Sequence, residues 1–214
     1  DNTVAIEYIM EWFKKRVPSR IGGISSIRPT SVNDRIMILK SGTGSGKSTT
    51  LSPELYRRFQ IGTGKNIAVT QPRVLTAMTI PLDVIEHYPE MIMGETIGYQ
   101  TGGYTNKPSK GVVFMTIGVL SQQLKTMTDD EFISKYSFVI IDECHERDTE
   151  MDIALSLAKS LIHRNYKTDN CPFLILTSAT FDTIRYAKFF GVNERNIIEV
   201  QGKNYPITEH FPPT

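Results

Sequence analysis

The sequence predicts an α/β fold in which helices cover both faces of a mostly parallel sheet. Three observations support this prediction: short apolar runs recur along the chain, helix-length stretches separate most of them, and the runs are almost wholly apolar instead of alternating with polar residues. Strands buried on both faces have this pattern, because helices pack on each side of a parallel sheet. With 214 residues, the chain is long enough for one domain with a substantial core.

The first predicted element is a helix that ends at Pro18. Its apolar residues recur at helical spacing, and they are Ile6, Ile9, Met10, Phe13 and Val17. Residues 1–34 are expected to comprise this helix and a connecting loop (18–34) rich in Gly, Ser and Pro, and residues 35–214 to form the main domain. The predicted strands of that domain are Ile36–Leu39, Asn66–Thr70, Val112–Thr116, Phe138–Ile141, Phe173–Thr177 and Asn196–Val200.

Two of the segments between strands have a clear pattern. Residues 150–163 predict a helix with one apolar face, formed by Met151, Ala154, Leu155, Ala158, Leu161 and Ile162. Residues 94–111 are rich in Gly, Thr, Tyr and Lys, and they predict a loop or a small hairpin. The tyrosines and lysines of this segment could contact a nucleic-acid strand, but an exposed hairpin with solvated lysines is the favoured interpretation; they are Tyr99, Tyr104, Lys107 and Lys110.

Composition and charge exclude several classes of protein. The 24 Lys and Arg residues nearly balance the 23 Asp and Glu residues, which argues against a broad cationic surface but allows a local phosphate-binding cleft. Cys144 and Cys171 form no CxxC pair, and this usage indicates a reduced, intracellular, soluble protein. No apolar run approaches the roughly 18 residues of a membrane span, so no membrane partner is expected. Because the chain begins at Asp1, we expect a fragment of a longer protein.

The strongest chemical motif follows the first predicted strand, and it reads Ser41-Gly42-Thr43-Gly44-Ser45-Gly46-Lys47-Ser48-Thr49. Its glycines allow backbone N–H groups to turn inward around a phosphate. Lys47 is predicted to bind the β- and γ-phosphates, and Ser48 to offer its hydroxyl to Mg²⁺. With a strand before it and a helix starting near Lys47, the segment 42–49 predicts nucleoside-triphosphate binding.

One position departs from the strict pattern G-x-x-x-x-G-K-[ST]. Ser41 stands where that pattern has glycine. Serine is small enough to occupy a tight turn, so we interpret the loop as a variant. The alternative is a chance loop rich in Gly, Ser and Thr.

Two carboxylates follow another buried strand, because Val139-Ile140-Ile141 leads directly into Asp142-Glu143. This is the ligand-binding edge of an open α/β sheet. Asp142 is predicted to hold Mg²⁺, and Glu143 to act as general base or to orient the attacking water. Burial of two adjacent carboxylates is costly without a cation. The alternative is a surface pair that caps the helix at 150. A lone histidine is more often an ordinary polar residue, but the position of His145 beside the carboxylates favours a role in coupling the nucleotide to another site.

In order and spacing, these segments resemble the first RecA-like domain of the DEAH/DExH-box helicases of superfamily 2. The resemblance covers roughly residues 36–211. Six segments resemble family motifs: Ser41–Thr49 motif I, Thr70–Arg73 motif Ia, Thr96–Tyr99 the start of the central hairpin region, Thr116–Gly118 motif Ib, Asp142–Arg147 motif II and Ser178–Thr180 motif III. Gly202–Pro206 resembles the exit toward a second domain.

The resemblance implies the motor lobe of an ATP-dependent RNA helicase or translocase, with ATP or another NTP and Mg²⁺ as ligands. Its catalytic residues would be Lys47, Asp142, Glu143 and His145. The residues that contact nucleic acid or couple it to the nucleotide would be Arg73, Thr116, Gly118, Ser178 and Thr180. The implied partners are single-stranded RNA, or DNA, and a second RecA-like domain for which these 214 residues have no room. The chain alone is therefore expected to bind ATP weakly and to hydrolyse it slowly or not at all.

Departures from the family pattern occur at Val74, Ile117 and Cys144, where the family usually has Arg, Asp and Ala. They indicate a divergent lineage, for which a viral origin is one interpretation. From the residues alone, Arg73 could also be a salt-bridge partner, and residues 178–180 could cap a helix over 181–190. A P-loop ATPase motor that does not act on nucleic acid is the alternative function. A nucleotide-dependent scaffold without catalysis is a third.

Overall fold

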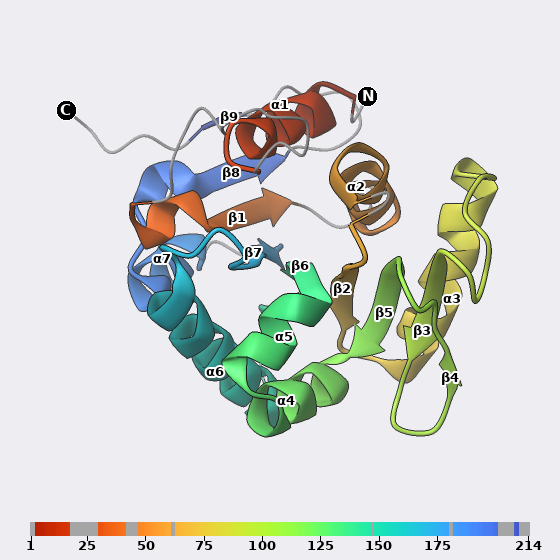
Figure 1. Cartoon of the computed structure of the whole chain (residues 1–214). Coiled ribbons are helices and arrows are strands. Elements are labelled where there is room, and N and C mark those ends of the chain that lie inside the picture. The colour runs from red at the N-terminus through yellow and green to blue at the C-terminus, as the bar shows by residue number, and fades with distance from the viewer. Residues whose placement is uncertain are drawn as a thin grey trace.

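The computed structural model describes residues 3–17, 30–41, 47–60, 63–146, 148–179, 182–200 and 208–209. Within these residues nine strands form one sheet, in the order β4-β3-β5-β2-β6-β7-β1-β8-β9 (Figure 1). Only the two outermost pairs, β3 with β4 and β8 with β9, are antiparallel in this described sheet. The predicted fold class, an α/β domain with a mostly parallel sheet covered on both faces, is confirmed.

All six predicted strands are present with small shifts of their ends. The described strands are β1 Ile36–Ser41, β2 Asn66–Gln71, β3 Ile97–Gln100, β4 Thr105–Asn106, β5 Val112–Thr116, β6 Tyr136–Ile141, β7 Phe173–Ser178, β8 Ile197–Val200 and β9 Thr208–Glu209. The described α-helices are α1 Thr3–Lys14, α2 Lys47–Leu55, α3 Val74–His87, α4 Ile117–Thr126, α5 Asp129–Lys135, α6 Thr149–Asn165 and α7 Thr183–Phe190. None of the helices among the described residues has the length and apolar character needed to cross a membrane.

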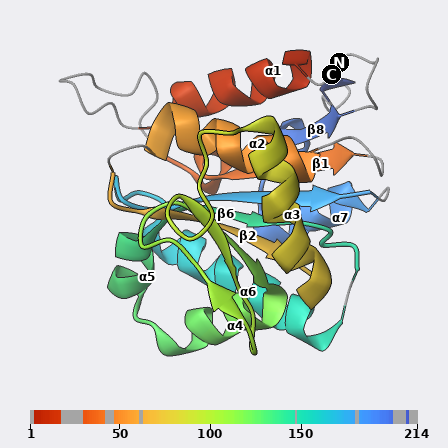
Figure 2. The same ribbon diagram turned by 90° about the vertical axis from the view of Figure 1, so that its right-hand side faces the viewer.

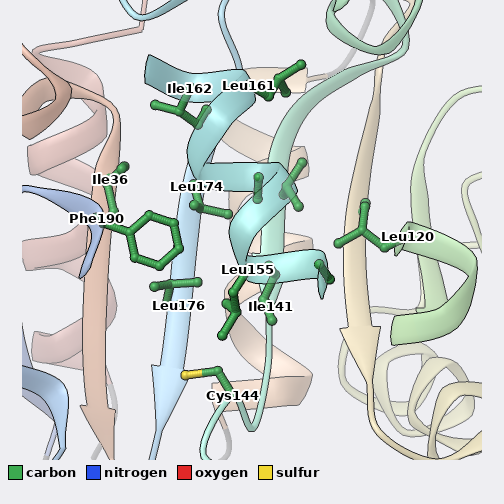
Figure 3. Close-up of a cluster of buried hydrophobic side chains, with 14 of the residues drawn as sticks. Ile36, Leu120, Ile141, Cys144, Leu155, Leu161, Ile162, Leu174, Leu176 and Phe190 are labelled. Atoms are coloured by element: carbon green, nitrogen blue, oxygen red, sulfur yellow. The ribbon is translucent and has the colours of Figure 1, made fainter. Parts of the chain in front are cut away.

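Two hydrophobic cores lie on the two faces of the sheet. Helices α1, α2 and α3 cover one face, and α4, α5, α6 and α7 cover the other (Figures 1 and 2). Figure 3 shows the second core, where Leu155 and Ile162 of α6 lie over Leu174 of β7. All six apolar residues predicted for the helix over 150–163 are buried, so this prediction is confirmed.

The N-terminal helix belongs to the first core. Four residues of its predicted apolar face are buried, whereas Val17 is partly buried and lies beyond the end of α1, which ends at Lys14 and not at Pro18. The ring of Phe13 packs edge-on against Phe138 of β6 and Phe173 of β7, with centroids 5.3 and 5.4 Å apart. Residues 18–29 of the expected connecting loop lie outside the described residues. The end of that segment, Val32–Asp34, forms a short 3₁₀ helix, because the Ser31 hydroxyl accepts a hydrogen bond from the backbone N–H of Asn33.

The segment over 94–111 contains the predicted hairpin and also extends the sheet. Strands β3 and β4 pair antiparallel, while β3 pairs in parallel with β5. Two glycines permit the close approach of the backbones: a Cβ on Gly98 would lie 1.9 Å from the carbonyl oxygen of Asn106, and a Cβ on Gly111 would lie 2.1 Å from that of Thr96. Strand β3 was not predicted from the sequence, because glycines and polar residues interrupt its apolar run.

Candidate nucleotide-binding site

The predicted motifs meet at one edge of the sheet. Because the central strands are parallel, the segments that follow β1, β2, β5, β6 and β7 all emerge there, and we call it the carboxyl edge. The arrowheads of β1 and β7 point toward it, at the right of Figure 2. Strand β6 lies between β2 and β7, so Gln71, Asp142 and Thr177 come from neighbouring positions.

Asp142 is buried, with a relative exposure of 2%, and hydrogen bonds fix its carboxylate from both sides. The side-chain amide of Gln71 donates to Oδ2 at 2.7 Å, and the Thr177 hydroxyl donates to Oδ1. The backbone N–H of Glu143 also donates to Oδ1, at 3.1 Å. Neither Gln71 nor Thr177 is among the site residues predicted from the sequence, although Gln71 lies in the segment that resembles motif Ia. The sequence does carry a signal for both residues, because each is a polar residue at the end of an apolar strand that neighbours β6.

Lys47, the first residue of α2, lies between the two carboxylates of the acidic motif. Its Nζ is 3.3 Å from Oδ1 of Asp142 and 3.5 Å from Oε1 of Glu143. The lysine side chain is 11% exposed, so solvent screens these contacts less than it would at an open surface. The structure thus brings together three of the four residues predicted to be catalytic. Of the two carboxylates only Asp142 is buried, while the Glu143 side chain is 25% exposed, and Lys47 supplies the cation that the buried carboxylate requires.

Glu143 has an unusual backbone conformation, with φ 58°, in the left-handed region. For a residue other than glycine this conformation costs about 1–2 kcal/mol. Hydrogen bonds hold the turn: the N–H of Glu143 lies 3.1 Å from the Thr177 hydroxyl as well as from Asp142, and the N–H of Cys144 donates to the Thr177 carbonyl at 2.9 Å. The turn places the Glu143 side chain beside Lys47.

His145, the fourth of these residues, links the acidic motif to the segment after β7. Its Nδ1 accepts a hydrogen bond from the backbone N–H of Ala179 at 3.2 Å, and its Nε2 lies 3.6 Å from Oε2 of Glu143. Ser178 is the buried last residue of β7, and Thr180 lies outside the described residues. Since Asp182 occupies the N-cap of α7, the helix-capping alternative does not hold for Ser178.

Cys144, where the resemblance expects alanine, serves packing. It is fully buried in the core beneath α6 (Figure 3), and the Tyr186 hydroxyl donates to its carbonyl at 3.0 Å. Burial raises the pKa of its thiol to about 12. The position therefore accepts a small, neutral side chain, either alanine or cysteine.

The capping alternative for Asp142 and Glu143 is wrong, because Asp148 occupies the N-cap of α6, where its carboxylate accepts a hydrogen bond from the backbone N–H of Met151.

Several predicted residues of the phosphate loop cannot be placed. Five of them lie outside the described part of the chain: Gly42, Thr43, Gly44, Ser45 and Gly46. Ser48 belongs to the first turn of α2, but its side chain is outside the description. Thr49 follows it in the same turn and is partly buried, and Ser41 is the buried last residue of β1.

The residues predicted to contact nucleic acid lie farther along the same edge. Arg73 is exposed at the start of α3, and no ion pair to it occurs within the described residues. Thr116 ends β5 and precedes α4, and a Cβ on Gly118 in that helix would meet open space. Gln71 is paired with Thr116 in the register of β2 and β5, so these two segments are neighbours. The structure thus places the segments after β2 and β5 side by side. Within the described residues, no described interaction joins Arg73, Thr116 or Gly118 to Lys47.

Comparison with known proteins agrees with this arrangement. Residues 3–183 match the family model described as type III restriction enzyme, res subunit. The chain belongs to this family. Putative RNA Helicase B962L of African swine fever virus (isolate Tick/South Africa/Pretoriuskop Pr4/1996) is 46% identical to it over 226 aligned positions, which cover 99% of this chain and 23% of the viral protein.

More distant relatives of the chain are cellular helicases. The probable ATP-dependent RNA helicase DHX35 homolog of Caenorhabditis elegans is 34% identical over 84% of this chain and 25% of its own length. The ATP-dependent RNA helicase HrpA homolog of Haemophilus influenzae is 33% identical over 84% of this chain and 13% of its own length. The resemblance to the DEAH/DExH-box helicases is confirmed, and the chain spans a quarter or less of the length of these relatives.

The side chains at the carboxyl edge of this family member also fit a divalent cation that accompanies a triphosphate. Mg²⁺ prefers carboxylate oxygens, and it is usually held by one or two carboxylates together with substrate phosphates. Asp142 offers a carboxylate fixed by three donors. Beside it, potential ligand atoms of Glu143, His145 and Glu146 lie within 4.8 Å of one another. The donor set is rich in oxygen, as a magnesium site requires.

Proposed function

We propose that this chain is the nucleotide-binding motor domain of an RNA helicase, and that it binds ATP or another nucleoside triphosphate with Mg²⁺ at the carboxyl edge. The observation that carries the proposal is the position of Lys47, whose ammonium lies 3.3 and 3.5 Å from the carboxylates of Asp142 and Glu143. Two motifs more than 90 residues apart thereby form one site. The printed names of the relatives, RNA helicases, support the same conclusion.

Lys47 would bind the β- and γ-phosphates. Its ammonium already lies at the first residue of α2, where unpaired backbone N–H groups and the helix dipole favour an anion. The contacts with Asp142 and Glu143 hold the ammonium in place. A triphosphate entering beside α2 would share this cation, and the predicted glycines at 42, 44 and 46 would surround the phosphates with N–H groups.

Asp142 would hold the metal ion, directly or through water, and the Ser48 hydroxyl is the second predicted ligand. When it is bound, Mg²⁺ neutralises the negative charge that develops on the phosphate oxygens. Gln71 and Thr177 keep the Asp142 carboxylate oriented. They are positioning residues in this proposal, since they act through Asp142.

Glu143 would serve as general base or orient the attacking water. In this step the water gives its proton to the carboxylate, its oxygen forms a bond to the γ-phosphorus, and the bond from that phosphorus to the β–γ bridging oxygen breaks. His145 touches Glu143 and the backbone N–H of Ala179. A shift of Glu143 during the reaction would therefore reach residues 178–180 through His145.

The rest of the motor would lie elsewhere in a longer protein. The chain covers 23% of the length of the viral relative, which leaves ample room for a second RecA-like domain. In helicases of this kind that domain would supply arginines to the transition state. Single-stranded RNA would cross the carboxyl edge beside Arg73, Thr116 and Gly118. The isolated chain would then bind the nucleotide weakly and hydrolyse it slowly or not at all.

Nucleotide binding by the chain tests the site. Titration with a fluorescent ATP analogue and Mg²⁺ should show saturable binding, and Lys47→Ala should weaken it at least tenfold, because a charge-assisted contact contributes about 1.5–3 kcal/mol. Lys188→Ala, which removes an exposed cation from α7, is the matched control and should bind as the unmodified chain does. Equal affinity in the Lys47 and Lys188 variants would contradict the assignment.

A further inference from the structure

The opposite edge of the sheet carries lysines that the proposed nucleotide site does not use. We call it the amino edge, because the parallel strands begin there; it lies at the left of Figure 2, beside α5. Lys65 directly precedes β2, Lys135 directly precedes β6, and Lys110 lies two residues before β5. These three strands are neighbours in the sheet.

The strand register aligns the three lysines. Ile67 of β2 is paired with Val112 of β5, and Asn66 is paired with Tyr136 of β6. Lys65 and Lys110 each lie two residues before the first of these pairs, and Lys65 and Lys135 each lie one residue before the second, so the three lysines precede neighbouring strands at this edge. The register of β2 and β6 shifts between Asn66 and Ile67. Neighbouring strands are about 4.8 Å apart, so the three backbones span a row of about 10 Å.

Further contacts extend the row. A Cβ placed on Gly64 would lie 3.9 Å from Nζ of Lys110, so this ammonium lies over the residue next to Lys65. Burial lowers the pKa of Lys135, and the positive charge of Lys107 lowers it further. Burial also lowers the pKa of Lys65, and Arg35 acts in the same direction. Lys65 and Lys135 are therefore each affected by one further cation.

These lysines lack carboxylate partners in the part of the chain that the structure describes. No ion pair there includes Lys65, Lys107, Lys110 or Lys135, and the carboxylates of Asp34 and Asp169 act on Arg35 instead. Two of these lysines also contact neutral groups: Lys107 donates to the Gln100 side chain at 3.3 Å, and Lys135 lies 5.5 Å from the centre of the Tyr136 ring. Like charges in register repel, so an anion that bridges them would be favoured.

We propose that the amino edge is a second nucleic-acid contact, which binds the sugar-phosphate backbone. A nucleic-acid strand carries one negative charge on each phosphate, so the row of lysines can face about two consecutive phosphates. Strands of five or six residues separate the two edges by about 20 Å. A backbone bound here is therefore distinct from the strand expected beside Arg73. Since phosphates alone are contacted, binding is independent of base sequence and strongly dependent on salt. This inference goes beyond the proposed function and does not require hydrolysis.

The test compares two double charge reversals in the chain. Lys110→Glu with Lys135→Glu changes the amino edge, and Lys159→Glu with Lys188→Glu makes the same change of charge on α6 and α7. Fluorescence anisotropy would follow binding of a labelled single-stranded RNA and of an RNA duplex over a range of salt concentrations. The first variant should bind about tenfold more weakly, and the slope of log affinity against log salt should fall by about 1.4 for the single strand, from two lost phosphate contacts. The control variant should keep the RNA affinity and the salt slope of the unmodified chain.

Four results would overturn the proposal: no RNA binding by the unmodified chain, unchanged binding in the first variant, equal losses in both variants, or equally tight binding of poly-glutamate at the amino edge. If the first variant does not fold, Lys110→Gln with Lys135→Gln decides the matter, with an expected loss of smaller size. Binding of the fluorescent ATP analogue is measured in parallel. It should be unaffected by the amino-edge variants, and its absence from the unmodified chain would count against the nucleotide site only.

Discussion

At the carboxyl edge of the sheet, Asp142 and Glu143 share the ammonium of Lys47, whereas at the amino edge Lys65, Lys110 and Lys135 have no carboxylate partner among the described residues. The first edge is built from opposite charges fixed by short contacts, and the second from like charges that precede three neighbouring strands. Charges that are paired in a fixed geometry favour a specific ligand that matches this geometry. Unpaired charges attract any polyanion and respond to salt.

Arg35 also lies at the amino edge, and within the described residues it is the one cation of that edge that is fully buried. It is stabilised in a different way. Its guanidinium donates to three backbone carbonyls: Nε to Tyr166 at 3.1 Å, Nη1 to Cys171 at 3.0 Å and Nη2 to Thr168 at 2.6 Å. These carbonyls belong to the segment between α6 and β7. Arg35 therefore serves stability, and the lysines around it remain available for a ligand.

The largest effect is expected at the carboxyl edge from Glu143→Gln. Loss of the general base should reduce nucleotide hydrolysis by the full-length protein about 10²–10⁴-fold, while nucleotide binding is retained. Phosphate release measured under saturating ATP tests this. Glu150→Gln, in the first turn of α6, is the matched control and should keep the unmodified rate. Equal rates in the Glu143 variant and the control would remove Glu143 from its proposed role.

At the amino edge, Arg35→Met should reduce the free energy of unfolding by about 3 kcal/mol or more. Methionine would fill the space, but three carbonyls would lose a charged donor, and each unsatisfied group costs about 1–3 kcal/mol. Urea denaturation of the chain measures the change. Arg164→Met breaks an exposed pair with Asp129 and should cost less than about 1 kcal/mol. A similar loss in both variants would show that the Arg35 contacts contribute little.

A smaller effect is expected from Thr177→Val, which removes the hydroxyl between Asp142 and the N–H of Glu143. The two carboxylates would lose part of their orientation, so hydrolysis should fall about tenfold, consistent with about 1–2 kcal/mol for the lost hydrogen bonds. Thr126→Val, at the exposed end of α4, is the control. Nucleotide affinity should change less than the rate does. A fall in affinity with an unchanged rate would contradict a positioning role.

The smallest effect concerns pH at the amino edge. Burial raises the pKa of the Cys171 thiol from 9.0 to about 11, against the lowering influence of Arg35 and Lys65. Below pH 9 both states keep the proton, and between pH 9 and 11 only the unfolded chain loses it, so the free energy of unfolding falls as pH rises. The change should be about 1–2 kcal/mol between pH 8 and 10, and smaller in Cys171→Ala. Identical pH dependence in both chains would contradict this.

Much of this arrangement could be predicted from the sequence. The apolar strands were found because parallel strands buried on both faces need no polar alternation, and the order of motifs located Lys47, Asp142 and Glu143. Hydrogen-bond partners were harder to find. Gln71 and Thr177 are single polar residues at strand ends, and only the order of strands in the sheet shows that they flank Asp142.

The amino edge could not be predicted for a related reason. Lys65, Lys110 and Lys135 are far apart in the sequence, and a net charge of +1 hides any local row. Their alignment depends on the register of β5, β2 and β6, which no local pattern encodes. Likewise, Arg35 precedes β1 as an ordinary charged residue, and its burial depends on carbonyls more than 130 residues away.

The central claim is that the carboxyl edge hydrolyses a nucleoside triphosphate in the service of movement on RNA. The most direct test is the rate of ATP hydrolysis by the full-length protein, measured with and without single-stranded RNA. We expect RNA to raise the rate several-fold, and Glu143→Gln to abolish the hydrolysis in both conditions. Equal rates with and without RNA would contradict the account and would indicate an ATPase motor that does not act on nucleic acid.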